Sequence, residues 1–227
     1  MILHLDNYRF PIYITETEWD DYIDICIGNL SCKPKPCIHI TVEKNHPEAG
    51  INAIQFYESC SISTRSFKRG SGAMVLFVKT ALKWLFQTYS YLRVIHLQDD
   101  SYFEDTTSKT ITMLPEKMVL TEGKTWYEKH FNALPSKKTQ MVLELYKYIH
   151  RQHSKELKRL PASAWYETTL VNTLKPYPCL EYKKLSGAEW SISRNIIEDY
   201  ECPAFYLSEG GSLQPQNILR RRIPRPF

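Results

Sequence analysis

Lys68-Arg69-Gly70-Ser71-Gly72-Ala73-Met74 is a basic, glycine-rich turn that leads into the strongest helical pattern of the chain, residues 73–89. A turn of this kind directs backbone N–H groups and a helix N-terminus toward one point, and this arrangement suits a phosphate group. Glycine is also common where helices begin, so the same residues can serve as a simple helix entry. The segments on either side of the turn therefore decide between the two interpretations.

Two strands and a helix are predicted before the turn. Residues 9–15 and 37–43 alternate apolar with polar side chains and are rich in β-branched residues, as strands are. Between them, residues 17–26 predict a helix, because four side chains share one helical stripe: Trp19, Tyr22, Ile23 and Cys26. The chain is therefore expected to begin as strand, helix, strand.

A strand, turn, helix, strand unit follows. Residues 51–62 predict a strand whose polar end runs into the glycine-rich turn, and residues 73–89 are apolar on nearly every side, as in a helix buried against a sheet. Residues 93–98 predict a short strand that ends at Asp99-Asp100-Ser101. Such a crossover places its strands beside each other in one sheet, or on either side of a ligand site at their C-terminal ends. We therefore expect an α/β fold.

The next part of the chain is predicted to be largely helical. Residues 110–114 fit either a brief strand or the lead into a helix, and residues 125–131 predict a short helix. A long amphipathic helix is predicted from residue 136, because four apolar side chains recur at helical spacing: Val142, Leu145, Tyr146 and Ile149. Its opposite face carries five basic side chains: Lys137, Lys138, Lys147, Arg151 and Lys155.

Composition and charge limit the class of protein. The 227 residues, 43% of them apolar, are enough for a substantial core. No apolar run approaches the roughly 18 residues of a membrane span, and the N-terminus does not resemble a signal peptide. We therefore expect a protein of the cytoplasm or nucleus that is neither secreted nor bound to a membrane.

The positive charge lies in the C-terminal part. The net charge is +4, and from residue 135 onward 15 Lys and Arg stand against 9 Asp and Glu. We expect three regions: a domain at residues 1–134, an extension at 135–216 that is helical and rich in aromatic residues, and a tail at 217–227. The tail contains Arg220-Arg221-Arg222 and Arg225, so it can bind nucleic acid or an acidic protein, or dock on its own chain.

Cysteine and histidine spacing gives little support for a metal site. The six cysteines are too few and too irregular for a disulfide framework, and we expect them to be thiols. Cys32 and Cys37 lack a second pair at zinc-finger spacing. His150 and His153 share a helical face, but no third ligand is near them in the sequence, so a solvated helical face is expected rather than a metal site.

Two motifs resemble the GNAT superfamily of acetyl-coenzyme-A-dependent N-acetyltransferases. Arg69 to Met74 matches the pyrophosphate loop (Arg/Gln)-x-x-Gly-x-(Gly/Ala) of that family, except that Met74 replaces the final small residue. Tyr127-Glu-Lys-His-Phe131 resembles the family's Tyr-Glu-Lys-x-Gly-Phe helix, with His130-Phe131 in place of the longer x-Gly-Phe. Leu97-Gln-Asp99 and Gly123-Lys-Thr-Trp-Tyr127 are also similar to divergent GNAT-like proteins of large DNA viruses. The resemblance covers roughly residues 9–134.

The resemblance implies a mixed twisted sheet with flanking helices and specific roles for individual residues. Tyr127 would give a proton to the thiolate of coenzyme A, and Glu58 would be the base that deprotonates the amine. Asp99, Asp100 and Ser101 would hold the amine or cap a helix. The thioester would lie against Ser59 and Ser61. The acetyl-coenzyme A pyrophosphate would bind the turn: Lys68, Arg69, Gly70, Ser71, Gly72, Ala73 and Met74.

Three functions stay open from the sequence. The first is an N-acetyltransferase whose acceptor amine is unknown. The second is a GNAT-fold protein that has lost catalysis and acts as a binding or structural component, for example in a viral particle, with the basic tail contacting protein or nucleic acid. The third is an unrelated α/β protein, either a nucleic-acid-binding module that uses the arginine tail or a cysteine hydrolase built on Cys60 with His96 or His130.

Overall fold

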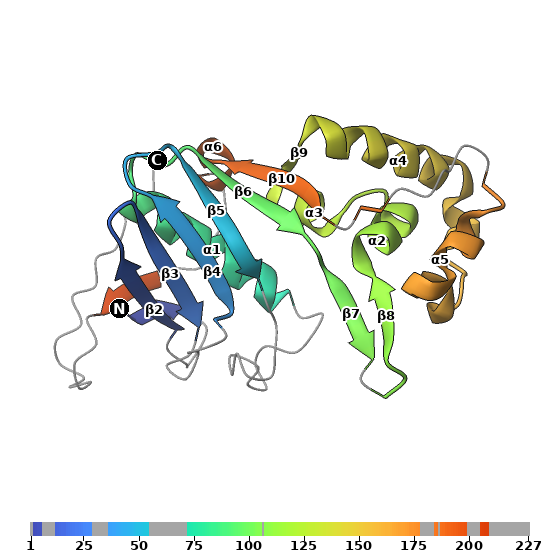
Figure 1. The fold of residues 1–227 in the computed structure, drawn as a ribbon, viewed down its shortest axis with the longest axis horizontal. Helices are drawn as coiled ribbons and strands as arrows, with labels where there is room; N and C mark the ends of the chain where they lie inside the picture. Colours follow the sequence, from blue (N-terminus) through green and yellow to red (C-terminus); the bar gives the residue numbers. More distant parts are fainter. Residues whose placement is uncertain are drawn as a thin grey trace. The chain divides into compact units, whose positions relative to one another are not determined.

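The computed structural model describes residues 2–5, 12–28, 36–54, 72–105, 107–177, 184–185, 187–198 and 205–208. It confirms the expected class, an α/β fold with a mixed sheet and flanking helices (Figure 1). The chain divides into two compact units: unit 1 is Met1–Ile95 with Arg194–Phe227, and unit 2 is His96–Ser193. In the described residues, no helix is both long and apolar enough to cross a membrane.

The sheet of unit 1 is built mainly from antiparallel neighbours. Its strands have the order β11-β1-β2-β3-β4-β5-β6, and the first residues of β6 belong to this unit. Figure 1 shows the arrows of β5 and β6 pointing the same way, as expected for strands joined by a helical crossover. The bounds are β1 (Ile2–Leu5), β2 (Ile12–Glu18), β3 (Tyr22–Gly28), β4 (Ile38–Glu43), β5 (Glu48–Ile54), β6 (Val94–Asp99) and β11 (Phe205–Ser208).

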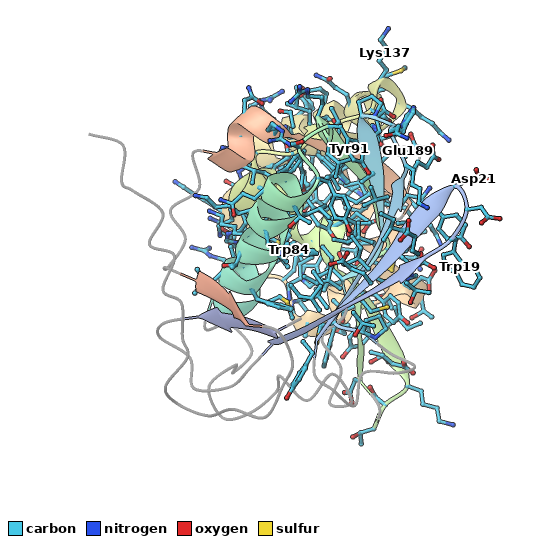
Figure 2. All side chains as sticks on the ribbon, turned by 90° about the vertical axis from the view of Figure 1, so that its left-hand side faces the viewer. Trp19, Asp21, Trp84, Tyr91, Lys137 and Glu189 are labelled. Atoms are coloured by element: carbon cyan, nitrogen blue, oxygen red, sulfur yellow. The ribbon has the colours of Figure 1, made fainter. Side chains whose placement is uncertain are left out.

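One apolar core lies between this sheet and α1 (Ala73–Thr88), which covers one face of the strands (Figures 1 and 2). The strands contribute mainly isoleucine, since alternate residues point to the same face. The short helix α6 (Arg194–Glu198) packs against α1. The fully or almost fully buried side chains include Ile25, Ile27, Ile38, Ile40, Phe77, Leu82, Trp84 and Leu85.

The predicted helix over residues 17–26 is wrong. These residues form the end of β2, a turn and most of β3, and the pairing runs from Glu18 opposite Ile23 to Tyr13 opposite Gly28. The isoleucines of β3 also alternate with period two, and Ile25 and Ile27 are fully buried. Two of the stripe residues, Trp19 and Tyr22, instead stack on each other at the exposed turn, with ring centroids 5.9 Å apart.

Unit 2 combines a short sheet, a hairpin and a group of helices. Its strand order is β6-β10-β9, and β7 pairs with β8 as a separate hairpin. Helix α2 packs against α4, and α5 packs against β8. The bounds are β7 (Tyr102–Asp105), β8 (Thr110–Met113), α2 (Leu114–Glu122), α3 (Trp126–Phe131), β9 (Leu134–Pro135), α4 (Lys137–Leu157), the 3-10 helix η2 (Ala162–Trp165), α5 (Glu167–Leu174) and β10 (Ala188–Ser193).

Several predicted elements are present with small shifts. The helices α1, α3 and α4 and the strand β6 lie where the sequence predicts them. Residues 110–114 form both of the expected alternatives, because β8 ends at Met113 and α2 begins at Leu114. Of the predicted stripe of α4, Tyr146 and Ile149 are buried, whereas Val142 and Leu145 are half-buried and Leu143 is buried instead.

Two further expectations differ from the structure. The expected domain boundary at residue 134 falls inside β9, which pairs with β10, so segments on both sides of that boundary pack within unit 2. Cys37 is buried and disulfide-bonded, which corrects the expectation that all cysteines are thiols, whereas Cys26 is a thiol. Sequence spacing gave no sign of this bond, because the pairing depends on which chain segments meet in space.

Candidate functional site

The end of β6 places a carboxylate inside unit 2. The burial of β6 alternates, and Asp99 lies on the same buried side as Ile95 and Leu97, with 1% of its surface exposed. Its Oδ1 accepts hydrogen bonds from the backbone N–H of Ser101 at 3.1 Å and from the Ser101 hydroxyl at 2.5 Å. Within the described part of the chain, the buried Oδ2 has no hydrogen-bond partner. Asp99 is therefore only half satisfied.

A second buried carboxylate, Glu116, lies in the first turn of α2 and is fully buried. Its Oε1 accepts a hydrogen bond from the backbone N–H of Leu185 at 2.8 Å. Two residues further on, the N–H of Gly187 donates to the backbone oxygen of Asp99 at 3.0 Å. The segment before β10 is therefore attached to both β6 and α2 beside the two acids.

Helix α3 supplies the tyrosine of the candidate site. Tyr127 is 8% exposed, and its ring lies against Trp126 and Phe131, with centroid distances of 5.1 Å and 6.2 Å. Thr125 and Glu128 form a capping box: the Glu128 N–H donates to Thr125 Oγ1 at 3.3 Å, and the Thr125 N–H donates to Glu128 Oε2 at 2.8 Å. The Lys147 ammonium of α4 donates to the other oxygen of Glu128 at 2.7 Å. The start of α3 is thus fixed from both sides.

The turn before α3 needs a glycine. Gly123 ends α2 with φ +78°, in the left-handed region that side chains disfavour. A Cβ at this position would also lie only 2.9 Å from Nε2 of His150, whose Nδ1 is hydrogen-bonded to the carbonyl oxygen of Leu120 at 2.8 Å. His150 therefore packs against the end of α2.

Burial and neighbouring negative charge raise the pKa of both Asp99 and Tyr127. The pKa of Asp99 is raised from 3.8 to about 6: burial is the main cause, the Ser101 hydrogen bonds oppose the shift, and the charges of Glu116 and Asp100 add to it. Burial also raises the pKa of Tyr127 far above its usual range, and the charges of Asp99 and Asp100 add to this effect. At neutral pH Asp99 is therefore mostly a carboxylate that can accept a proton, and Tyr127 keeps the proton that it can donate.

The structure brings together part of the site predicted from the sequence. Asp99 and Tyr127 are buried in unit 2 and are coupled electrostatically, while Asp100 is exposed and Ser101 is half-buried. The alternative role of these residues as a helix cap is wrong, because β7 begins directly after Ser101. Glu116 was missed, since a glutamate that follows a proline at a helix start usually faces solvent.

The residues expected to bind coenzyme A belong to unit 1. Gly72 caps α1 in the left-handed conformation with φ 75°, no side chain caps this helix, and its first turn contains no acidic residue. Met74 is half-buried. The other expected residues lie outside the described part of the chain: Glu58, Ser59, Ser61, Lys68, Arg69, Gly70 and Ser71.

Two alternative sites gain no support from the described residues. There, no three His, Cys, Asp or Glu side chains form a group that could hold a metal ion. His153 pairs with Glu156 at 3.3 Å rather than with His150. For the cysteine hydrolase, Cys60 lies outside the described residues, and His130 packs against Trp126 with a centroid distance of 5.7 Å.

Comparison with known proteins does not assign the chain to a family: no protein-family model, curated protein or solved structure matches it. Membership of the GNAT superfamily therefore stays a prediction from the two motifs. Any assignment of function depends on the chemistry of the site itself.

Proposed function

We propose that the chain is an N-acetyltransferase that transfers an acetyl group from acetyl-coenzyme A to an amine. Two buried groups that interact electrostatically carry this proposal: Asp99 at the end of β6, with a pKa of about 6 and a buried oxygen that has no hydrogen-bond partner in the described residues, and the protonated Tyr127 of α3. Perturbed acids and bases of this kind concentrate at functional sites. Ligands of open α/β sheets also bind at the C-terminal ends of strands.

Transfer of an acetyl group to an amine needs a proton acceptor and a proton donor. Acetyl-coenzyme A supplies the activated thioester. Asp99 takes the proton that the amine loses as its nitrogen bonds to the acetyl carbon, and Tyr127 donates a proton to the sulfur when the carbon–sulfur bond breaks. Glu58 is the alternative base from the sequence, so the two carboxylates need separate tests.

The described start of α1 is compatible with an anionic cofactor. Its first backbone N–H groups have no side-chain cap, no acidic side chain lies in the first turn, and the left-handed Gly72 leads the chain into the helix. Backbone N–H groups in this state favour phosphate oxygens. The backbone N–H groups of Gly72, Ala73 and Met74 are therefore suited to bind a phosphate group.

Removal of single proton-transfer groups tests the proposal. Purified protein is incubated with acetyl-coenzyme A and a panel of amines comprising a polyamine, an amino sugar and a peptide with a free N-terminus, and release of the coenzyme A thiol is measured. Tyr127→Phe is expected to lower kcat about 100-fold with little change in the Kd for acetyl-coenzyme A. Tyr102→Phe, which removes the hydroxyl of an exposed tyrosine in the same unit, should leave both quantities unchanged.

The base is identified by comparing Asp99→Asn with Glu58→Gln. Asp99→Asn is expected to cause the larger loss of kcat. In the parent, kcat should fall as pH drops below about 6, because Asp99 becomes protonated, and this fall should be missing in Asp99→Asn. Acetyl-coenzyme A should also raise the Tm, because it binds only the folded chain. No rise in Tm at millimolar acetyl-coenzyme A would contradict the proposal and favour the non-catalytic alternative.

A further inference from the structure

The outer face of α4 carries a stripe of exposed side chains that nothing in the proposed function uses. The buried side of this helix consists of Thr139, Leu143, Tyr146, Ile149 and Leu157. On the opposite side, residues at alternating spacings of four and three form one continuous line. Its members are Lys137, Met141, Glu144, Tyr148, Arg151 and Lys155, all exposed. Figure 2 shows the side chain of Lys137 pointing away from the rest of the chain.

This face is strongly basic. Six exposed cations lie on α4 or in the turn that follows it: Lys137, Lys138, Arg151, Lys155, Lys158 and Arg159. None of the six makes an ion pair within the described residues, whereas the two exposed acids of the helix are engaged. Glu144 lies 4.0 Å from Lys147, and Glu156 lies 3.3 Å from His153. Lys147 also pairs with Glu128, and His153 is charged only when protonated, so these two acids count against the six cations and the face keeps a net positive charge.

Exposed apolar side chains lie among these cations. Met141 is 78% exposed and Tyr148 is 49% exposed, although both belong to a helix whose other side is well packed. Tyr148 lies between Lys137 and Arg151 along the stripe. A cationic surface interleaved with an accessible aromatic ring is the pattern that binds single-stranded nucleic acid, because the cations contact phosphates and the ring stacks on a base.

We propose that the outer face of α4 binds single-stranded nucleic acid. The helix has 21 residues and is about 30 Å long, enough to follow several nucleotides of an extended strand. Two of the cations lie in the first turn of α4 and four lie near its end or just beyond it, so phosphates of one extended strand can be contacted at both ends of the helix, with Tyr148 between them. A membrane surface fits less well, because an interfacial helix buries its apolar face in lipid, and the apolar face of α4 is already buried in protein.

The proposal is independent of acetyl transfer and of the arginine tail. Its test measures fluorescence anisotropy of a labelled 20-nucleotide oligothymidine titrated with the full chain at 50 and 200 mM salt. The variant Lys137→Gln/Arg151→Gln/Lys155→Gln is expected to lower affinity at least tenfold, and to reduce the slope of log affinity against log salt by about 2. The matched control Arg93→Gln/Lys124→Gln/Lys175→Gln removes the same three charges from exposed positions elsewhere, and should bind within twofold of the parent.

Tyr148 tests the stacking contact. Tyr148→Ala is expected to weaken oligothymidine binding about tenfold, and Tyr148→Phe to restore it, because the phenyl ring still stacks. A 20-base-pair duplex should bind more weakly than the single strand. Binding that prefers the duplex and is insensitive to Tyr148→Ala would overturn the single-strand assignment.

Two further arms identify other sources of binding. Neutralising the tail with Arg220→Gln/Arg221→Gln/Arg222→Gln/Arg225→Gln should leave most of the affinity in place. If this variant abolishes binding while the α4 variant does not, the proposal is wrong and the tail is the site.

Polyglutamate of matched charge should compete poorly, because it offers no base to stack. Competition equal to that of oligothymidine would show that the face binds acidic protein instead.

Discussion

The two units of the chain bury different kinds of side chain. In the described residues, unit 1 buries one polar side chain, Thr80, whose hydroxyl donates to the carbonyl oxygen of Leu76 in the same helix at 2.9 Å. Unit 2 buries five polar side chains, and two of them are carboxylates: Asp99, Thr112, Glu116, Thr125 and Thr139. The energetic cost of burying charge is therefore concentrated in unit 2.

Among the described side chains, the carboxylates of unit 1 are in contact with solvent. In a shallow hollow over β3, β4 and β5, the Thr41 hydroxyl donates to Asp24 at 2.9 Å, and the Asn52 amide donates to Thr41 at 2.6 Å. These groups satisfy one another and stay accessible. Asp99 in unit 2 instead keeps a buried oxygen unpaired within the described residues, at a cost of several kcal/mol to any fold. In the described residues, the buried carboxylates on which the proposed function rests therefore belong to unit 2.

The largest expected effect is a cavity in the core of unit 1. Leu82→Ala removes a fully buried side chain of α1 and is expected to lower the free energy of unfolding by about 3–5 kcal/mol, as measured by urea denaturation. Gln87→Ala, at an exposed position of the same helix, should change it by less than about 0.5 kcal/mol. A loss below about 1 kcal/mol for Leu82→Ala would show that the core of unit 1 does not carry the stability assigned to it.

Asp99→Asn should raise the free energy of unfolding at neutral pH, whereas Leu82→Ala lowers it. The pKa of Asp99 is about 6 in the folded chain, against the ordinary value of 3.8 that applies to the unfolded chain. Between pH 3.8 and 6 the folded state therefore binds a proton that the unfolded state releases. Stability therefore falls as pH rises from about 4 to 6, by up to about 3 kcal/mol. Asparagine does not titrate and still offers an oxygen to Ser101. The variant should thus be more stable than the parent at pH 7.5 by about 1–3 kcal/mol.

The check is urea unfolding at several pH values between 3.5 and 7.5. The variant and the parent should converge below pH 4, where Asp99 is protonated in both states of the parent. Glu104→Gln, at an exposed carboxylate of β7, should leave the pH dependence of the parent intact. A variant that is less stable than the parent at pH 7.5 would mean that the charge of Asp99 stabilises unit 2.

The sequence predicted the elements whose signals are local and strong. Helix α1 is long and apolar, and it was found with nearly correct bounds, as was α3. The capping box of α3, Thr125-x-x-Glu128, is a local signal of the same kind. The same local reasoning found Asp99, because it ends an apolar strand, and Tyr127, because its neighbours resemble a known motif. For these residues, the neighbouring few positions of the sequence are enough to make the prediction.

Other features depend on partners far away in the sequence. Residues 17–26 fit a helical stripe as well as alternation, and only pairing with β2 and β4 makes Tyr22–Gly28 a strand. The hydrogen-bond donor to the buried Glu116 is the backbone N–H of Leu185, 69 residues later in the sequence. Arg194 donates to the carbonyl oxygens of Phe86, Tyr89, Ser90 and Leu92, more than 100 residues earlier. No local pattern marks either side chain for such a role.

The smallest expected effect is at the start of α3, where unit 2 buries a polar group whose hydrogen bonds are satisfied. Thr125→Ala removes the acceptor for the Glu128 N–H and should lower the free energy of unfolding by about 1 kcal/mol. Thr125→Ser keeps a hydroxyl that accepts this hydrogen bond, so most of the stability of the parent should remain. Both are measured by urea denaturation, together with kcat for acetyl transfer. Because the capping box fixes the first turn of α3, Thr125→Ala should also lower kcat through Tyr127. Loss of stability with unchanged kcat would show that the cap stabilises the helix without positioning the tyrosine.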